Sequence, residues 1–140
     1  MSEIARALKA IKERFGIDEK VFDGFSLIEK GDIWISSKEA TTIKVPGISR
    51  VGIRLIRVFR DGYKLTTAGI QLFGKYATKN VLEISEDKLQ DYLEGKDIYV
   101  GPSECEEGQV IVKCGKDYLG SGLYAKGKLK NQLPKGRRWF

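Results

Sequence analysis

Residues 109–124 read QVIVKCGKDYLGSGLY, and this stretch decides the fold of the second half of the chain. Branched aliphatic residues and tyrosines favour strands on both sides of Gly115-Lys-Asp, which is a turn sequence. The stretch therefore predicts two strands joined by a tight turn. We expect Gly120-Ser-Gly122 to shape a bulge between the strands, the alternative being a close approach of backbone to a phosphate.

The residues before this hairpin predict a strand, a helix and another strand. Val81-Leu-Glu-Ile has strand character, Ser85 suits a helix cap, and residues 86–93 follow as a helix. Ile98-Tyr-Val is the next strand. A strand, a helix and several short strands with glycine-rich turns indicate a small, partly closed barrel with one helix over an end.

The first half mixes helix and strand signals. Apolar residues at helical spacing predict a helix near residues 3–14. Short runs of strand character predict two hairpins, the second turning at Asp61-Gly62. Residues 66–77 combine apolar residues with two glycines, so helix and irregular structure both stay open there. The expected strands lie at residues 25–28, 32–36, 51–60 and 63–65.

No stretch rich in Ser, Gly and Pro separates the halves, so we place a boundary near residue 79 and expect the two parts to pack rigidly. The predicted class is α+β. It has an N-terminal α/β domain over residues 1–79 and a C-terminal β-barrel over residues 80–140.

Charge is unevenly distributed along the chain, whose net charge is +6. Residues 50–79 hold seven basic and one acidic side chain, and residues 110–140 hold eight and one. Residues 80–109 hold two and nine, while residues 1–49 are balanced. Two basic blocks in one small chain favour a polyanionic partner, because Lys and Arg near phosphates release counterions.

The composition excludes several kinds of chemistry. The chain has no histidine, and its two cysteines, Cys105 and Cys114, have no second pair, so we predict no metal site, no cofactor and no catalytic residues. No apolar run approaches the roughly 20 residues that span a bilayer, and the N-terminus lacks the apolar stretch of a signal peptide. We expect a cytoplasmic protein without a membrane partner.

Several motifs carry a resemblance to known families. The segment 82–140 resembles a PUA domain in its residues 86–98, in Gln109-Val-Ile-Val-Lys and in Tyr118-Leu-Gly-Ser-Gly-Leu. Residues 127–138 look like the tail of the PUA-like domains appended to RNA 5-methylcytosine methyltransferases of the NOP/Sun type. In the first half, residues 31–39 and 73–79 are similar to the pre-PUA domain of small two-domain ribosome-assembly factors.

These resemblances imply binding of ribosomal or transfer RNA through the barrel. Basic side chains of the last segment can contact phosphates, Asn131 can read a base edge or ribose hydroxyl, and Tyr124 can stack on a base unless it belongs to the barrel core. Lys75 and Lys79 are candidates for a second patch. The predicted RNA-binding residues are Lys75, Lys79, Tyr124, Lys126, Lys128, Lys130, Asn131, Lys135, Arg137 and Arg138.

A row of arginines at positions 50, 54, 57 and 60 is a weaker candidate for that second patch than Lys75 and Lys79. Strict strand alternation places Arg54 and Arg57 on opposite faces. A single arginine ladder therefore requires a bulge near Leu55-Ile56.

The methyltransferases of the resemblance need a cofactor-binding domain with a glycine-rich loop and a cysteine nucleophile, which these 140 residues lack. The leading interpretation is a non-catalytic RNA-binding protein of ribosome biogenesis or RNA modification. One alternative is an accessory subunit that delivers RNA to a separate RNA 5-methylcytosine methyltransferase. The expected protein partner is a methyltransferase or a ribosome-assembly protein. Another is a protein-interaction module that uses the acidic block.

Overall fold

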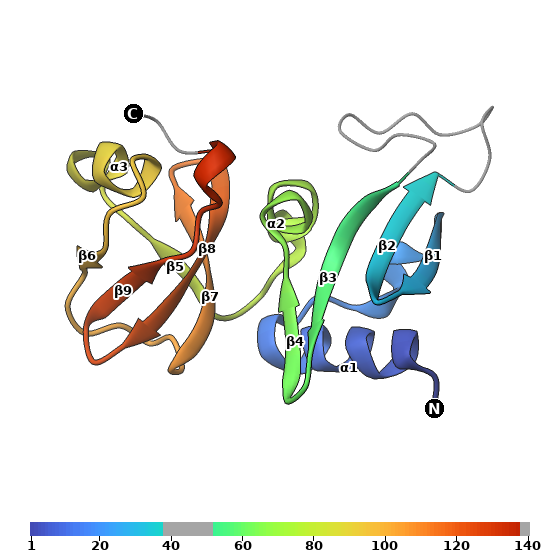
Figure 1. Ribbon diagram of the computed structural model, residues 1–140. Coiled ribbons are helices and arrows are strands. Elements are labelled where there is room, and N and C mark those ends of the chain that lie inside the picture. The colour runs from blue at the N-terminus through green and yellow to red at the C-terminus, as the bar shows by residue number, and fades with distance from the viewer. Residues whose placement is uncertain (38–51, 138–140) are drawn as a thin grey trace.

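The computed structural model describes residues 1–37 and 52–137, and residues 38–51 and 138–140 lie outside the described part. Two β-sheets, one antiparallel and one mixed, lie beside each other, and helix α2 (Thr67–Phe73) lies between them (Figure 1). The predicted α+β class is confirmed. No helix in the described residues is long and apolar enough to cross a membrane.

The first sheet has the strand order β1-β2-β3-β4, all antiparallel. Helix α1 (Glu3–Phe15) packs against it, and Ser2 and Gly16 cap that helix at its two ends. The predicted helix and both predicted hairpins are confirmed. The strands are β1 (Phe25–Lys30), β2 (Asp32–Ser37), β3 (Ile53–Phe59) and β4 (Gly62–Leu65), and a short 3-10 turn η1 (Glu19–Phe22) precedes them.

The open question at residues 66–77 is settled as helix α2, followed by the 3-10 turn η2 (Gly74–Tyr76). Thr66 caps α2, since its hydroxyl accepts a hydrogen bond from the Gly69 N–H at 3.0 Å. The same hydroxyl donates to the carbonyl oxygen of Arg54 at 2.6 Å. One side chain therefore ties the start of α2 to strand β3.

The second sheet has the order β5-β7-β8-β9-β6, with β5 parallel to β7 and the other pairs antiparallel. It curls into a half-barrel with helix α3 (Glu86–Leu93) over one end (Figure 1). The PUA-like architecture predicted for this half is confirmed. Its strands are β5 (Val81–Glu83), β6 (Ile98–Tyr99), β7 (Gly108–Cys114), β8 (Asp117–Ala125) and β9 (Lys128–Asn131), and η3 (Lys135–Arg137) ends the described chain.

The predicted bulge in this sheet lies one residue before the predicted glycines. Val112 faces Gly120 and Lys113 faces Tyr118, so Leu119 is the extra residue of β8. Gly120 is required for packing, because a Cβ there would lie 2.8 Å from the Tyr92 hydroxyl.

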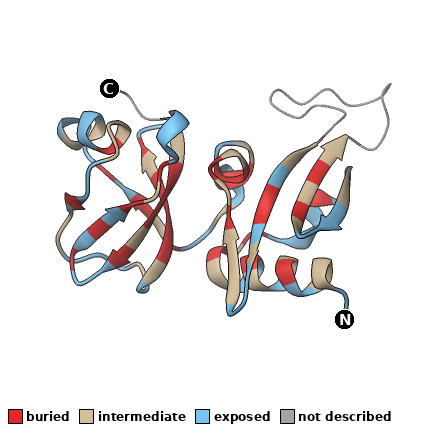
Figure 2. Ribbon diagram, in the orientation of Figure 1, coloured by how far each residue is buried: buried red, intermediate tan, exposed pale blue. Residues whose placement is uncertain are grey.

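Each sheet has its own buried core, and both cores run through the centre of their domain (Figure 2). Ile111 of β7 belongs to the core of the first sheet, so the two cores meet at the boundary. Tyr118 also packs against that core, and a Cβ at Gly74 would lie 2.8 Å from its ring. The domain limits 1–79 and 80–140 stay a prediction.

Hydrogen bonds of buried side chains join the two sheets. The Gln109 amide donates to the Leu65 carbonyl at 2.9 Å and accepts from the Leu65 N–H at 3.1 Å, as a neighbouring strand would. Arg14 of α1 donates to the Gln109 and Glu106 carbonyls, both at 2.8 Å. These contacts fix how β4 lies against the half-barrel.

Candidate nucleic-acid interface

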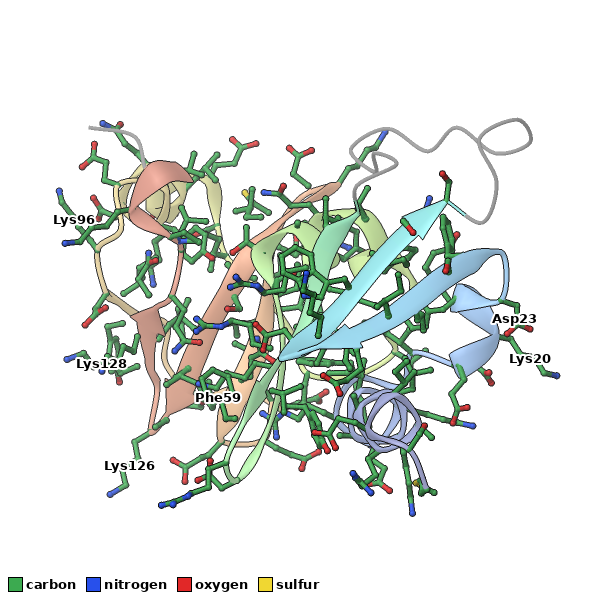
Figure 3. The ribbon with its side chains drawn as sticks, turned by 45° about the vertical axis from the view of Figure 1, so that its right-hand side comes forward. Lys20, Asp23, Phe59, Lys96, Lys126 and Lys128 are labelled. Carbon is green, nitrogen blue, oxygen red and sulfur yellow. The ribbon has the colours of Figure 1, made fainter. Side chains whose placement is uncertain are left out.

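Three of the predicted lysines lie on the outside of the half-barrel. In β9, Lys128 and Lys130 alternate with buried Leu129 and Asn131, so both lysines point outward. Lys126 lies in the preceding turn with a φ of 51°, and Figure 3 shows Lys126 and Lys128 extending into solvent. We call the surface formed by Lys126, Lys128, Lys130 and Tyr99 the β9 face.

Tyr99 is a member of this surface that the sequence reading missed. It is the cross-strand partner of Lys128, and 70% of its surface is exposed. Tyr99 and Lys126 also line one shallow pocket. An exposed tyrosine beside lysines can stack on a base while the lysines contact phosphates.

Two predicted contact residues have structural roles instead. Tyr124 is buried in the core of the second sheet, where its hydroxyl donates to the Gly101 carbonyl at 3.2 Å. The predicted base-stacking role is therefore corrected to the alternative, a core tyrosine. This packing leaves the ring only 6% exposed.

Asn131 is likewise buried, and its side-chain amide is used inside the domain. The amide N–H groups donate to the carbonyl oxygens of Tyr92 and Lys96 at 2.8 and 3.0 Å. Its oxygen accepts from the Leu133 N–H at 2.8 Å. Because both amide hydrogens are engaged, the predicted role of reading a base edge is corrected to one of holding β9 against the end of α3.

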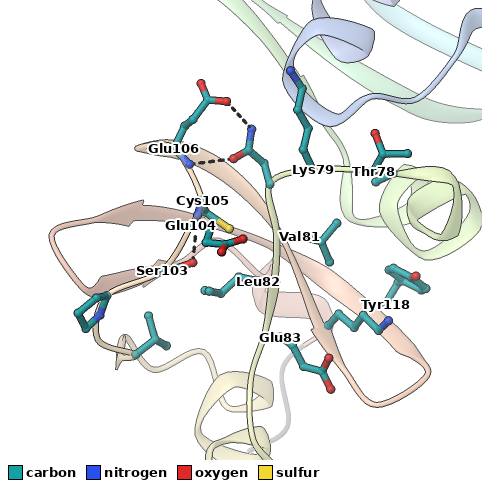
Figure 4. Close-up of a pocket in the computed structure, with 15 residues that line it drawn as sticks. Thr78, Lys79, Val81, Leu82, Glu83, Ser103, Glu104, Cys105, Glu106 and Tyr118 are labelled. Atoms are coloured by element: carbon teal, nitrogen blue, oxygen red, sulfur yellow. Dashed lines mark hydrogen bonds between the residues drawn. The ribbon is translucent and has the colours of Figure 1, made fainter.

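The predicted second patch consists of two separate lysines. Lys75 is exposed, with its Nζ 5.3 Å from the ring centroid of Tyr76. Lys79 is also exposed and lines a polar pocket of about 640 Å³ (Figure 4). That pocket mixes the charges of Lys79 and Lys113 with those of Glu83, Glu104 and Glu106, so it does not form a basic patch.

Glu106, one of the carboxylates that line this pocket, also has a structural role. The Glu106 N–H donates to the Asn80 side-chain oxygen at 2.8 Å, and the Asn80 amide donates back to the Glu106 carboxylate at 3.3 Å (Figure 4). The described residues include no group of three or more metal-ligating side chains placed to hold an ion.

The arginine ladder has the bulge that it requires. Trp34 of β2 faces Arg54, and Ile33 faces Ile56, so Leu55 is the extra residue of β3. Leu55 and Ile56 are both fully buried, while Arg54 and Arg57 are both exposed. The bulge thus brings the two arginines to the same face of the sheet.

This face forms one wall of a groove between the two domains, with a cavity volume of about 500 Å³. Arg57 and Lys64 are cross-strand partners there. The Arg57 guanidinium carbon lies 5.2 Å and the Lys64 Nζ 5.1 Å from the ring centroid of Phe59, which Figure 3 labels. Such distances are those of cation–π contacts.

The other wall of the groove comes from the C-terminal segment and includes Lys135. The predicted basic run is therefore divided: Lys128 and Lys130 belong to the β9 face, and Lys135 belongs to the groove. The side chain of Arg137 and the whole of Arg138 lie outside the described residues, as does Arg50. We call the surface formed by Arg54, Arg57, Phe59, Lys64 and Lys135 the interdomain groove.

The cations of the interdomain groove differ in their partners. Arg54 forms an ion pair with Asp32 at 3.2 Å and lies 5.4 Å from the ring centroid of Trp34. Asp32 also accepts from the Val58 N–H at 2.8 Å, which fixes the carboxylate. Within residues 1–37 and 52–137, no carboxylate forms an ion pair with Arg57, Lys64 or Lys135.

The fold and these two surfaces define the class: an α+β protein whose second domain is a PUA-like half-barrel with basic surfaces on and beside it. Comparison with known protein families shows which PUA domain the second domain is similar to. Residues 79–139 match the family described as Methyltransferase RsmF PUA domain, which confirms that the second domain resembles a PUA domain.

Curated relatives extend the similarity into the first half. The chain is 30% identical over 131 residues to Ribosomal RNA small subunit methyltransferase F of Shewanella oneidensis, which aligns with 91% of the chain. It is 31% identical over 86 residues to the protein of the same name in Aeromonas salmonicida. The alignments cover 27% and 18% of those relatives, so the chain spans under a third of their length. The chain is thus a distant homologue of one part of these proteins.

Proposed function

We propose that this chain is a non-catalytic RNA-binding protein whose ligand is ribosomal or transfer RNA, acting in RNA modification or ribosome biogenesis. The observation that carries the proposal is the match of residues 79–139 to a PUA domain of an RNA methyltransferase. The two basic surfaces support it, because each combines exposed cations with an exposed aromatic ring.

The proposal assigns no catalysis to these 140 residues. A 5-methylcytosine methyltransferase needs a reactive thiolate, and Cys114 is a poor candidate. Cys114 is buried, and burial together with the nearby carboxylates of Glu86 and Glu83 raises the pKa of its thiol. A raised pKa reduces the thiolate fraction at neutral pH, which is the opposite of what a nucleophile needs.

The test of RNA binding is a fluorescence-anisotropy titration of the full chain with labelled transfer RNA and ribosomal RNA fragments at several salt concentrations. We expect the logarithm of the association constant to fall linearly with the logarithm of the salt concentration. Binding absent even at low salt overturns the proposal. Methyl transfer to RNA by the purified chain alone overturns its non-catalytic part.

A second candidate function is that of an accessory subunit which brings RNA to a separate methyltransferase polypeptide. The observation that favours it is the length of the alignments, since the relatives named methyltransferases are more than three times as long as the matched segment. A methyl-transfer assay with and without this chain, using a separately purified catalytic polypeptide, distinguishes the two functions. Stimulation of methyl transfer supports the accessory role.

A further inference from the structure

The interdomain groove brings together cations from both domains. Arg57 comes from β3, Lys64 from β4, and Lys135 from the C-terminal segment of the second domain. None of the described residues that line the groove is Asp or Glu. Phe59 lies among these cations with 38% of its surface exposed, although a large apolar ring is ordinarily covered. We propose that this groove binds an unpaired nucleotide of a single-stranded RNA segment, and this inference rests on the RNA-binding function proposed above.

The cations suit the phosphodiester backbone. Arg57 offers a planar fork of N–H donors that matches two phosphate oxygens, and Lys64 beside it offers a point charge. Neither forms an ion pair with a described carboxylate, so a phosphate does not have to displace a protein carboxylate. Lys135 faces them from the other domain, so one phosphodiester segment in the groove is contacted from both walls.

The aromatic ring suits an unpaired base. Stacking on an aromatic side chain requires a base face that is free of its neighbours, which a duplex does not offer. When Arg57 and Lys64 turn from the Phe59 ring to phosphates, that ring becomes available to a base. The cavity of about 500 Å³ is in the range of sites for small molecules, so it is large enough for an extruded nucleotide.

The groove is preorganised by contacts that leave the charged side-chain groups of its cations unengaged. Gln109 pairs with the backbone of Leu65 beneath it, and Thr66 holds the carbonyl of Arg54 at the bulge. Both walls are therefore fixed relative to one another before any ligand arrives. An acidic peptide would also be attracted by the cations, but it would make no use of the ring.

The experiment measures anisotropy of the full chain with a labelled short oligouridine and with a labelled RNA duplex. Phe59→Leu keeps an apolar side chain and removes the ring, while Phe59→Trp keeps a ring. We expect Phe59→Leu to weaken oligouridine binding about tenfold, as the loss of one stacked base does, and Phe59→Trp to retain it. Duplex binding should be unaffected by either change.

The charge arm combines Arg57→Ala, Lys64→Ala and Lys135→Ala in one variant. The salt slope is the slope of the logarithm of the association constant against the logarithm of salt concentration. For oligouridine this slope should be smaller in magnitude by roughly 2, since each lost single-strand phosphate contact removes about 0.7. Circular dichroism and thermal unfolding confirm that each variant is folded. The control is the double variant with Lys128→Ala and Lys130→Ala. In that background, Phe59→Leu should still weaken oligouridine binding about tenfold.

The outcomes separate the two proposals. If the wild-type chain binds neither RNA, the RNA-binding function fails and this inference fails with it. If the wild-type chain binds oligouridine and the folded groove variants bind it equally well, only the groove assignment is wrong. Polyglutamate is tested as a competitor of oligouridine. If it competes equally well for the Phe59→Leu variant and the wild-type chain, and Phe59→Leu does not change RNA binding, the groove binds acidic protein segments. That result overturns the inference.

Discussion

The β9 face and the interdomain groove use similar side chains in different settings. Each places lysines near an exposed aromatic ring, Tyr99 in the first case and Phe59 in the second. The β9 face belongs to one hairpin and its short neighbour β6, whereas the groove needs both domains. If both surfaces bind RNA as proposed, we expect similar composition to give general affinity on the β9 face and selectivity for unpaired RNA in the groove.

The largest effect, a loss of folding stability, is expected from removing the hydrogen bonds between Gln109 and Leu65 that hold the two walls of the groove together. Gln109→Leu removes both hydrogen bonds to the buried backbone of Leu65 and should lower the free energy of unfolding by about 3 kcal/mol. Urea unfolding measures this change. The control Gln90→Leu alters an exposed amide of α3 and should have almost no effect. Equal stability of the two variants would show that the Gln109 amide does not hold the domains together.

A second stability effect concerns Asn131 of β9, whose side chain is buried inside the second domain. Asn131→Ala leaves three polar backbone groups without their partner and should cost about 2 kcal/mol of unfolding free energy. The salt slope of RNA binding should not change, because no charge is removed. A stable Asn131→Ala protein with altered discrimination among RNAs would restore the base-reading role.

The third prediction compares the two surfaces directly with three charges removed from each. Changing Lys126, Lys128 and Lys130 together to Ala should weaken binding of both single-stranded and duplex RNA, with a salt slope smaller by roughly 2 for the single strand and roughly 3 for the duplex. The groove variant with Arg57, Lys64 and Lys135 changed should weaken single-stranded RNA alone. Anisotropy titrations of both variants against both RNAs provide the measurement. Identical profiles would mean that the surfaces act as one site.

The smallest effect is expected at Tyr99. Because Tyr99 is 70% exposed, a base stacked on it stays largely in water, and Tyr99→Ala should weaken RNA binding by less than about 1 kcal/mol. Tyr76→Ala is the matched control, since Tyr76 is also an exposed tyrosine beside a lysine. A Tyr99→Ala loss as large as that of Phe59→Leu would remove the difference between the two surfaces.

Much of the fold follows from local sequence signals. The hairpin at residues 109–124, helix α3 and the hairpin that turns at Asp61-Gly62 all have strand or helix periodicity and proper turn residues, and the structure confirms them. Residues 66–77 could not be assigned, because the helix there depends on the Thr66 cap and on packing against β8. Tertiary contacts of this kind leave no periodic signal.

The site was less accessible to sequence reasoning. The run of basic residues after position 125 suggested one surface, but strand alternation and the turn after β9 send Lys130 and Lys135 to different places. The bulge at Leu55 could be stated only as a condition, since one extra residue in a strand has no sequence signature of its own. Phe59 and Tyr99 were missed because an aromatic residue in a strand is ordinarily a core residue.

The pairing between Gln109 and Leu65 also bears on how the first domain behaves when it is alone. Strand β4 is an edge of its sheet, and Gln109 occupies the backbone groups that another strand would otherwise engage. Proteolysis between the domains would uncover this edge together with the apolar surface beneath Ile111. The isolated first domain should therefore be prone to self-association through added strands, and the half-barrel acts as its built-in protection against aggregation.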